Sequence, residues 1–358
     1  MTLTLQPLLD QLGRTSGPSL WLADENNAGM MDALAQDRAD VVLITNRYDI
    51  ARTAKRLGIQ AHFSDFDFNF LQTLPEQQRP RNIFYRVSKE RAVTNHLINS
   101  SYKLLPPGGQ LWLSGQKSEG IKTYFSQAGE LFAHSTKPHK QGNIYCGGLT
   151  KNRSDGLLLN DNHYSTPRWV ETANCPAFIS KPGTYGWDKI DKGSAFLLEQ
   201  FQAVSQDMDM STRRFLDLGC GYGYITLQCR SLGFKSMTAT DNNAAAIACM
   251  QANAAHFAIP VQVIADDCAS QITDSFDIIA CNPPFHQGFS IDTSLTDKFL
   301  ANSWRLLADG GRAYFVVNAF IPLEAKAQQL MAGKDVDGIS VLANNKQFKV
   351  IEIRKKKK

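Results

Sequence analysis

Three pairs of segments in this 358-residue chain match one another in the same order. Residues 101–113, SYKLLPPGGQLWL, align without a gap with residues 303–315, SWRLLADGGRAYF, at an offset of 202 positions. Two further pairs match at an offset of 196 positions, namely 19–27 with 215–223 and 82–89 with 278–285. Three matches at nearly constant offset predict that one fold occurs twice in tandem.

The second copy shows the pattern of an α/β fold, in which short β-branched runs alternate with helical stretches. The final segments, GISVLANN and QFKVIEIR, flank a polar turn and are typical of an antiparallel hairpin. We therefore expect a seven-stranded, mostly parallel sheet that ends in this hairpin. Five parallel strands are expected at 213–218, 235–241, 261–265, 276–281 and 311–318.

The first copy is degenerate, because it has no glycine loop after its first strand and no Asn-Pro-Pro after its fourth. We expect residues 1–154 to form this degenerate domain. Residues 155–195 contain a stretch rich in proline and glycine, which is typical of a linker or lid. Residues 196–358 are then expected to form the second domain, which keeps both motifs.

Composition places the chain among globular proteins without a membrane span. Hydrophobic residues make up 43% and charged residues 20%, and no apolar run is long enough for a transmembrane helix or a signal peptide. The seven cysteines form no CxxC pair, so neither a metal site nor a disulfide framework is expected. We expect a cytoplasmic protein with no metal and no membrane partner.

The net charge of +4 is mild, but the basic residues are unevenly distributed. Lys and Arg concentrate in residues 79–103 and 131–154, and the chain ends in RKKKK. Such stretches can neutralise the phosphates of a nucleic acid, although a solvated surface is the alternative interpretation.

A glycine-rich loop, DLGCGYG, follows the first expected strand of the second copy. Glycines let a ligand approach the backbone, and the following helix begins with unpaired N–H donors. Tyr224 stands where a dinucleotide fingerprint needs glycine, and the loop lacks the Lys-Ser/Thr of a P-loop. We therefore expect a cofactor without a pyrophosphate or triphosphate. The candidate cofactor residues of the loop are Asp217, Gly219, Cys220, Gly221 and Gly223.

Carboxylates follow the next two expected strands. Asp241 ends the second strand, where it can accept hydrogen bonds from both hydroxyls of a ribose. The alternative is a helix cap, because Asp241, Asn242 and Asn243 precede a helical stretch. Asp266 and Asp267 follow the third strand, and one of them can accept from an adenine amino group or else cap a turn. Asn242 is included among the candidate cofactor residues.

The fourth expected strand ends in Asn282-Pro283-Pro284-Phe285. Proline fixes φ and removes an N–H donor, so the local carbonyls remain available as acceptors. The side-chain oxygen of Asn282 and the carbonyl of Pro283 can together accept both hydrogens of a planar exocyclic amine, and Phe285 offers a face for base stacking. This combination favours methylation of an amino nitrogen, although a turn that ends the strand is the alternative. Asn282 is also a candidate cofactor residue.

These motifs resemble the class I S-adenosylmethionine-dependent methyltransferases, and among them the bacterial ribosomal-RNA guanine-N2 methyltransferases of the methyltransferase small domain type. DLGCGYG is similar to the family's cofactor loop, Asp241 to its ribose acid, and NPPFH to its catalytic motif. Residues 183–198 resemble the segment that leads into the catalytic domain, except that Tyr185 and Gly186 replace a Phe-Ser pair. The resemblance implies two tandem Rossmann-like methyltransferase domains, of which the first is inactive and helps to hold RNA.

The function that follows is methyl transfer from S-adenosyl-L-methionine to N2 of a guanine in ribosomal RNA. A guanine amine is paired inside a duplex, so the target must be flipped out or already unpaired. The expected substrate is 16S rRNA in the 30S subunit, and the expected state is a monomer. The candidate substrate-contacting residues are Phe285, His286, Arg86 and Lys89.

Other functions are compatible with the same sequence motifs. A 23S rRNA guanine-N2 methyltransferase shares the same motifs, and enzymes acting on adenine N6 or on a protein glutamine amide use a similar Asn-Pro-Pro motif. A non-catalytic RNA-binding assembly factor would fit the first copy. A nicotinamide dehydrogenase is disfavoured by Tyr224 and by Asn282-Pro283-Pro284.

Overall fold

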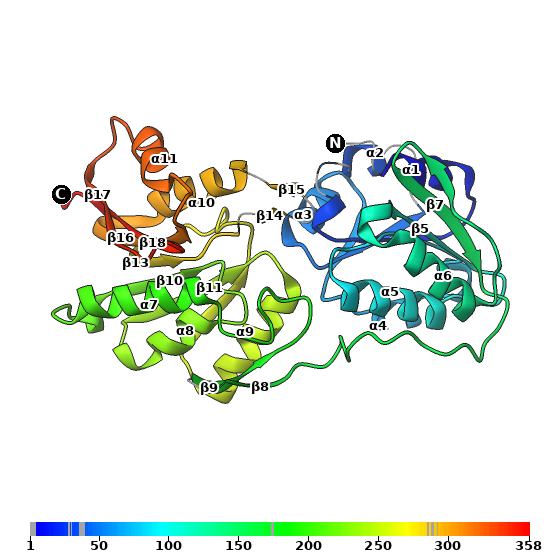
Figure 1. The fold of residues 1–358 in the computed structure, drawn as a ribbon, viewed down its shortest axis with the longest axis horizontal. Coiled ribbons are helices and arrows are strands. Elements are labelled where there is room, and N and C mark those ends of the chain that lie inside the picture. The colour runs from blue at the N-terminus through cyan, green and yellow to red at the C-terminus, as the bar shows by residue number, and fades with distance from the viewer. Residues whose placement is uncertain are drawn as a thin grey trace. The chain divides into compact units, whose positions relative to one another are not determined.

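The computed structural model describes residues 5–27, 29, 31–35, 40–172, 175–284, 286–287, 290–291 and 293–358. The chain divides into two compact units, Met1–Thr166 (unit 1) and Pro167–Lys358 (unit 2). Each unit contains one seven-stranded sheet with helices packed against it (Figure 1). The predicted pair of α/β domains is therefore confirmed.

The sheet of unit 1 has the strand order β3-β2-β1-β4-β5-β7-β6, in which the first five strands are parallel and β7 and β6 are antiparallel. The strands are β1 (Ser19–Ala23), β2 (Val41–Thr45), β3 (Gln60–Phe63), β4 (Asn82–Arg86), β5 (Gln110–Gln116), β6 (His139–Gln141) and β7 (Ile144–Thr150). The helices are α1 (Gln6–Arg14), α2 (Met31–Ala35), α3 (Tyr48–Arg56), α4 (Asn69–Gln72), α5 (Arg91–Leu104) and α6 (Ile121–Phe132).

The sheet of unit 2 has the corresponding order β12-β11-β10-β13-β16-β18-β17, again with an antiparallel hairpin at one edge. Its strands are β10 (Arg214–Leu218), β11 (Ser236–Asp241), β12 (Val261–Ala265), β13 (Phe276–Cys281), β16 (Leu307–Asn318), β17 (Val336–Asn344) and β18 (Phe348–Lys355). Two small hairpins pair β8 (Arg168–Thr172) with β9 (Cys175–Ser180), and β14 (His286–Gln287) with β15 (Ser290–Ile291). The helices are α7 (Lys192–Ser205), α8 (Tyr224–Cys229), α9 (Ala244–His256), α10 (Thr293–Leu306) and α11 (Leu323–Leu330).

Strand pairing reproduces the two offsets found in the sequence. Tyr85 on β4 pairs with Leu113 on β5, and Cys281 on β13 pairs with Phe315 on β16. The first members of these pairs are 196 positions apart, and the second members are 202 apart. Unit 2 therefore has six more residues between its fourth and fifth strands, which is where the Asn-Pro-Pro-Phe motif begins.

The central strands are apolar because both faces of each sheet are covered. Successive residues point to opposite faces, so Ile278 and Ile279 on β13 join two different cores, and both are fully buried. This burial leaves the loops at the carboxyl ends of the parallel strands as the positions open to polar side chains. Within the described ranges, no helix is long and apolar enough to cross a membrane.

Candidate active site

The glycine loop leaves β10 in a conformation that only glycine adopts readily. Gly219, Gly221 and Gly223 have φ values of 79°, 56° and 95°. A Cβ at position 223 would lie 2.0 Å from the sulfur of Met250, so a larger residue there would displace the Met250 side chain in addition to straining the backbone. Beside Gly221, by contrast, a Cβ would meet no atom within 4 Å. The loop is therefore closed towards α9 and has open space at Gly221, as a ligand cradle requires.

Asp217 is a buried carboxylate, and one of its two oxygens is hydrogen-bonded within unit 2. Its Oδ2 accepts hydrogen bonds from the backbone N–H and the hydroxyl of Thr226, at 3.0 and 2.7 Å. Its Oδ1 is buried without a partner. Burial raises the pKa of Asp217 to about 7, and the negative charge of Asp241 adds to the shift. The ammonium group of a bound amino acid moiety would satisfy Oδ1 and neutralise this charge, so the residues present fit the expected cofactor.

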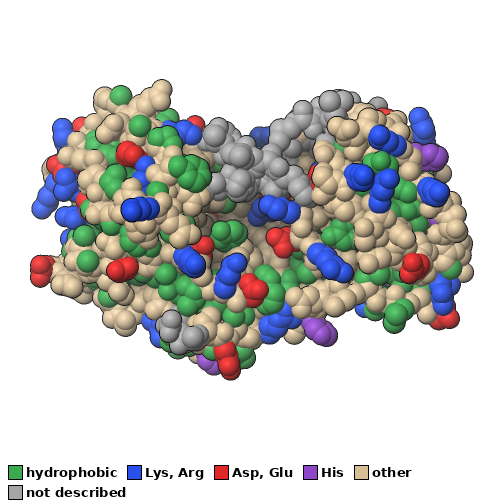
Figure 2. Space-filling model, in the orientation of Figure 1, with side chains coloured by type: hydrophobic (Ala, Val, Ile, Leu, Met, Phe, Trp, Pro, Cys, Tyr) green, Lys and Arg blue, Asp and Glu red, His purple; other side chains and the backbone are tan. Residues whose placement is uncertain are grey.

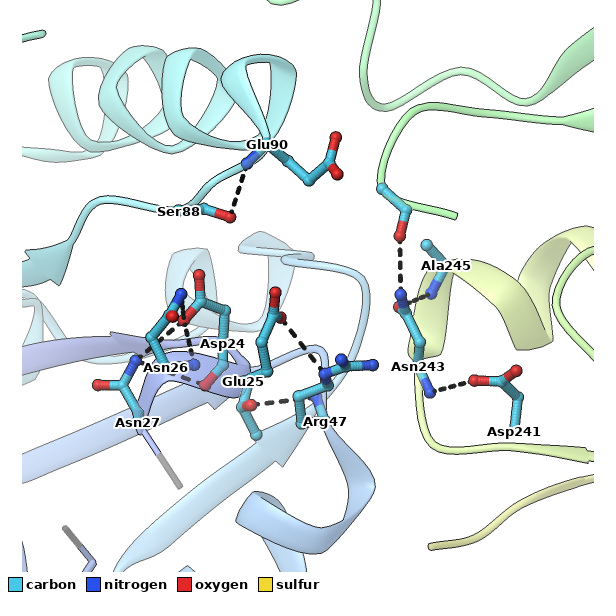
Figure 3. Close-up of polar contacts among 12 residues, drawn as sticks. Asp24, Glu25, Asn26, Asn27, Arg47, Ser88, Glu90, Asp241, Asn243 and Ala245 are labelled. Carbon is cyan, nitrogen blue, oxygen red and sulfur yellow. Dashed lines mark hydrogen bonds and ion pairs between the residues drawn. The ribbon is translucent and has the colours of Figure 1, made fainter. Parts of the chain in front are cut away.

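Asp241 connects the end of β11 to the glycine loop. Its Oδ2 accepts from the Gly221 N–H at 2.9 Å. Its Oδ1 accepts from the Asn243 N–H at 2.8 Å, as Figure 3 shows. The cap of α9 is Asn243, whose side chain accepts from the Ala245 N–H at 2.9 Å. Since Asn243 fills the capping role, the helix-cap alternative does not explain Asp241. A carboxylate oxygen can accept more than one hydrogen bond, and neighbouring Asn242 is half-buried.

The two aspartates after β12 differ in their surroundings. Asp266 is buried, and its two oxygens accept from Asp267 N–H, Ser270 Oγ and Gln271 N–H. These bonds close the turn that follows the strand, which is the structural role weighed from the sequence. Asp267 forms an ion pair with Lys298. Of the two residues, Asp267 is the better candidate for contact with an adenine amino group.

Asn282 lies directly after β13, and its amide group is held by the start of α7. Its Nδ2 donates to Asp191 Oδ2 at 2.7 Å and to Ser194 Oγ at 2.9 Å. A carboxylate can only accept, so the NH2 group must face Asp191 and the amide oxygen must face the other way. The arrangement therefore fixes the orientation of the Asn282 side chain, with its oxygen pointing away from Asp191.

The rest of the motif is described only in part. Pro283 is buried and Pro284 is exposed. Phe285, predicted to be a stacking residue, lies outside the described residues, and so does the side chain of His286. The backbone of His286 begins β14 and pairs with Ile291.

Asp191 and Ser194 are site residues that were not assigned a role from the sequence. Asp191 caps α7 by accepting from the Ser194 N–H at 2.8 Å, and the same oxygen holds Asn282. Earlier in the same segment, the Gly183 carbonyl accepts from Asn243 Nδ2 at 2.7 Å. The segment therefore contacts both the Asp241 loop and Asn282. In the sequence, only the resemblance of residues 183–198 to the segment that leads into the family's catalytic domain pointed to it.

Unit 1 repeats the backbone of this edge with different side chains. Thr45 occupies the position of Asp241, 196 residues earlier, and its hydroxyl accepts from the Arg47 N–H at 3.1 Å. In place of the glycine loop, Asp24 Oδ1 accepts from the backbone and side chain of Asn26 and from the side chain of Asn27 (Figure 3). The equivalent edge thus has no ribose carboxylate and no glycine cradle.

The structure requires a correction for Arg86, which was predicted to contact the substrate. Arg86 occupies the position of Asn282 in unit 1, but it is buried and forms an ion pair with buried Glu119. Its Nη1 also donates to the Val87 carbonyl at 2.9 Å. A guanidinium enclosed in this way supports the loop rather than an RNA phosphate. Lys89 is exposed, and its RNA contact stays a prediction.

Metal chemistry has no obvious ligands in the part of the chain that the structure describes. No group of three or more His, Cys, Asp or Glu side chains there is placed to hold an ion. The described cysteines are free thiols, namely Cys146, Cys220, Cys229, Cys249, Cys268 and Cys281. Burial raises the pKa of Cys220 well above its usual range, so it is not a reactive thiolate.

Residues 176–352, which include every unit 2 element of this site, match the family described as "Methyltransferase small domain". This segment is a methyltransferase small domain. The predicted class of enzyme, a methyltransferase, is confirmed. The match begins in β9, passes through the Asp191 segment and ends in β18.

Curated relatives match this chain over most of its length. A protein of Shewanella loihica named "Ribosomal RNA small subunit methyltransferase C" is 26% identical over 332 residues, which cover 90% of each chain. A protein of the same name from Marinomonas is 27% identical, over 65% of this chain and 67% of its own. The structure of the Thermus thermophilus 16S rRNA N2 G1207 methyltransferase, in complex with AdoMet and guanosine, aligns with a TM-score of 0.80. It is 22% identical and covers 98% of this chain and 92% of its own, so the methyltransferase domain and its degenerate partner share one tandem fold with it.

Proposed function

We propose that the protein transfers a methyl group from S-adenosylmethionine to N2 of a guanine in 16S ribosomal RNA. The observation that carries this proposal is the orientation of Asn282, whose NH2 group is held by Asp191 and Ser194. The names of the Shewanella and Marinomonas relatives, and the guanosine bound by the Thermus enzyme, support the choice of substrate.

The Asn282 oxygen is suited to the chemistry of an exocyclic amine. The lone pair of guanine N2 is delocalised into the ring, so the nitrogen is a poor nucleophile. When the Asn282 oxygen and the Pro283 carbonyl accept its two hydrogens, the nitrogen can become pyramidal, and the positive charge that develops on it is stabilised. Alignment of the two reactants supplies the rest of the acceleration, and no strong base is needed before attack.

The residues of the carboxyl edge hold the cofactor in this proposal. S-adenosylmethionine, when bound, supplies an electrophilic methyl group. Asp217 Oδ1 pairs with its ammonium group, Asp241 accepts from its ribose, and Asp267 accepts from its adenine amine. The backbone of Gly219, Cys220, Gly221 and Gly223 lines the cradle, with Asn242 beside it. Asp266 supports this edge through its turn.

The remaining residues position the RNA. Phe285 is proposed to stack on the unpaired guanine, His286 to shape the pocket, and Lys89 to contact the backbone. Figure 2 shows Lys and Arg side chains spread over the displayed face of both units rather than gathered in one patch. Residues 1–154 then serve as a structural or RNA-holding domain, residues 155–195 as a connecting segment and residues 196–358 as the catalytic domain. We propose a cytoplasmic monomer that acts on the 30S subunit.

The test is methyl transfer from radiolabelled S-adenosylmethionine to 30S particles, 50S particles and naked rRNA, all from cells without this gene. Label is expected in 16S rRNA, and digestion to nucleosides should yield N2-methylguanosine. Label in 23S rRNA alone would show that 23S rRNA, and not 16S rRNA, is the substrate. A labelled N6-methyladenosine would show that the acceptor is adenine N6 and not guanine N2. If no RNA is labelled but glutamine in a protein is, the RNA proposal is wrong.

A further inference from the structure

Phe320 is a large apolar side chain that the fold leaves in solvent. It lies in the turn between β16 and α11, and 80% of its surface is exposed. The residues just before it behave differently, because Phe315, Val316 and Val317 on β16 are fully or almost fully buried. β16 thus buries its last apolar residues, and the turn that follows it exposes the ring of Phe320.

Strand pairing places the loop that carries Phe320 at the same edge of the sheet as Asn282. β16 is the direct neighbour of β13 and runs parallel to it, with Phe315 opposite Cys281. Asn282 follows Cys281, and Phe320 lies five residues beyond Phe315, so both stand past the same edge of the sheet. Neighbouring strands are about 5 Å apart. Phe320 therefore belongs to the loop beside Asn282.

The turn between β17 and β18 lies at the same edge. Asn318, at the end of β16, pairs with Phe348, and Ala319 N–H donates to the Gln347 carbonyl at 2.9 Å. On its other side Phe348 faces the start of α7, because a Cβ on Gly193 would lie 3.4 Å from its ring. Gly193 lies directly before Ser194 and two residues after Asp191, and these two residues hold Asn282. The turn is consequently joined to the catalytic asparagine by packed contacts.

Lys346 is at the tip of this turn and is exposed. Asn344 Oδ1 accepts from the Lys346 N–H at 2.9 Å, and Asn345 Oδ1 accepts from the N–H groups of Gln347 and Phe348. These bonds fix the turn, so the lysine projects from a defined backbone. Among the described residues, no carboxylate forms an ion pair with Lys346, whereas Lys349 nearby is paired with Glu324.

We propose that Phe320 and Lys346 form a flanking surface that binds the unpaired nucleotides next to the target guanine. Phe320 stacks on a neighbouring base, and Lys346 contacts a phosphate. An exposed aromatic ring beside an unpaired cation is the combination by which proteins hold single-stranded nucleic acid without reading its sequence. The inference rests on the proposed RNA substrate, and it adds a contact outside the Asn-Pro-Pro-Phe motif.

The direct test is binding of a fluorescent single-stranded oligoribonucleotide with one guanine to the full-length protein, followed by anisotropy. Phe320→Ala should raise the dissociation constant about tenfold, since stacking of one base on an aromatic ring has about this effect. Phe320→Tyr should retain wild-type affinity, because it keeps the ring. Lys346→Ala should weaken binding and lower the slope of log affinity against log salt by about 0.7, the value for one phosphate contact with a single strand.

Matched controls come from the same unit. Trp169 is a half-exposed aromatic residue on β8, and Lys235 is an exposed lysine just before the amino end of β11. Trp169→Ala and Lys235→Ala should bind the oligonucleotide as the wild type does. If Phe320→Ala also binds like the wild type, or if the controls weaken binding equally, the flanking surface is wrong.

Methyl transfer to 30S particles separates this inference from the proposed function. Phe320→Ala should raise the KM for the particles and leave the dissociation constant of S-adenosylmethionine unchanged. If the wild type methylates no RNA but still binds the oligonucleotide through Phe320, the proposed function fails and the flanking surface stands. If the wild type is active and Phe320→Ala has the same KM and RNA affinity, the flanking surface fails alone.

Discussion

Asn282 and Asp191 are 91 residues apart in the sequence, yet the amide nitrogen of one lies 2.7 Å from the carboxylate of the other. The same carboxylate oxygen caps α7 through the Ser194 N–H. One aspartate thus ties the orientation of the Asn282 amide to the beginning of a helix. Since an amide can rotate to present either its oxygen or its NH2, this contact decides that the oxygen of Asn282 points away from Asp191.

Asp191→Ala should therefore lower kcat by about tenfold or more, because the Asn282 amide loses its charged acceptor. Asp191→Asn should recover most of the activity, since its side-chain oxygen can still accept from Asn282 and still cap the helix. Both variants should bind S-adenosylmethionine normally. Steady-state methylation and calorimetric titration of the cofactor would measure the two quantities.

Asp191→Ala removes the cap of α7 as well as the contact that orients the Asn282 amide, so the two effects must be distinguished. Asp209 is a suitable control, because its side chain caps a short 3₁₀ turn in the same unit by accepting from Ser211 N–H. Asp209→Ala should lower the free energy of unfolding by about 1 kcal/mol, as removal of a cap does, without changing kcat. An equal fall in kcat for both variants would mean that Asp191 acts only through stability.

Asn282→Ala should lower kcat by about a hundredfold or more, since removal of one polar group that stabilises transition-state charge has about that effect. The dissociation constant of S-adenosylmethionine should change little, because the glycine loop and Asp241 remain. The measurement is single-turnover methyl transfer with saturating cofactor. Near-normal transfer would remove Asn282 from the mechanism.

Asp241→Ala should raise the dissociation constant of S-adenosylmethionine about tenfold or more, which corresponds to about 1.4 kcal/mol per decade. Thr45→Ala is its matched control, because Thr45 makes the same kind of contact with the backbone two residues later in unit 1. That variant should leave cofactor affinity unchanged. If Asp241→Ala binds S-adenosylmethionine as tightly as the wild type does, Asp241 stabilises the glycine loop without contacting the cofactor.

The duplicated fold was predictable from the sequence because it depends on features that recur along the chain. Apolar runs, glycine pairs and segment spacing gave the offsets of 196 and 202 that strand pairing reproduces. The same alignment gave Arg86 in unit 1 the position that Asn282 has in unit 2. The positive charge of Arg86 then suggested a contact with RNA. Burial cannot be read from charge alone, and the partner that explains Arg86 is Glu119, 33 residues later.

The parts of the site that the sequence did not reveal depend on tertiary contacts. Asp191 has an evident local role as a helix cap, and nothing in its neighbourhood indicates that it also reaches Asn282. Asn243 and Asp241 are two residues apart and both precede a helix, so the sequence left open which one caps it. Their hydrogen bonds resolve this, because Asn243 accepts from the helix while Asp241 faces the glycine loop.

A pH-dependent stability is expected from Asp24, the buried carboxyl at the carboxyl edge of the unit 1 sheet. Burial, and after it the charge of Glu25, raise the pKa of Asp24 to about 6. The folded protein therefore binds this proton more tightly than the unfolded chain does. Stability contributed by the protonated carboxyl is present below about pH 4, declines as the pH rises towards 6, and is lost above that pH.

Asp24→Asn should remove this dependence, because an amide stays neutral and keeps an oxygen to accept from Asn26 and Asn27. Near pH 7.5 the variant should be more stable than the wild type by about 1–3 kcal/mol, and near pH 4 the difference should vanish. Hydrogen exchange of the β1 and β2 amides in the full-length protein, between pH 4.5 and 8, reports on unit 1 directly. Asp155→Asn, at an exposed ion pair with Arg153, should leave the profile as it is. If the stability of wild-type unit 1 does not fall relative to that of Asp24→Asn between pH 4.5 and 8, the buried carboxyl is stabilised in its charged form and the prediction is wrong.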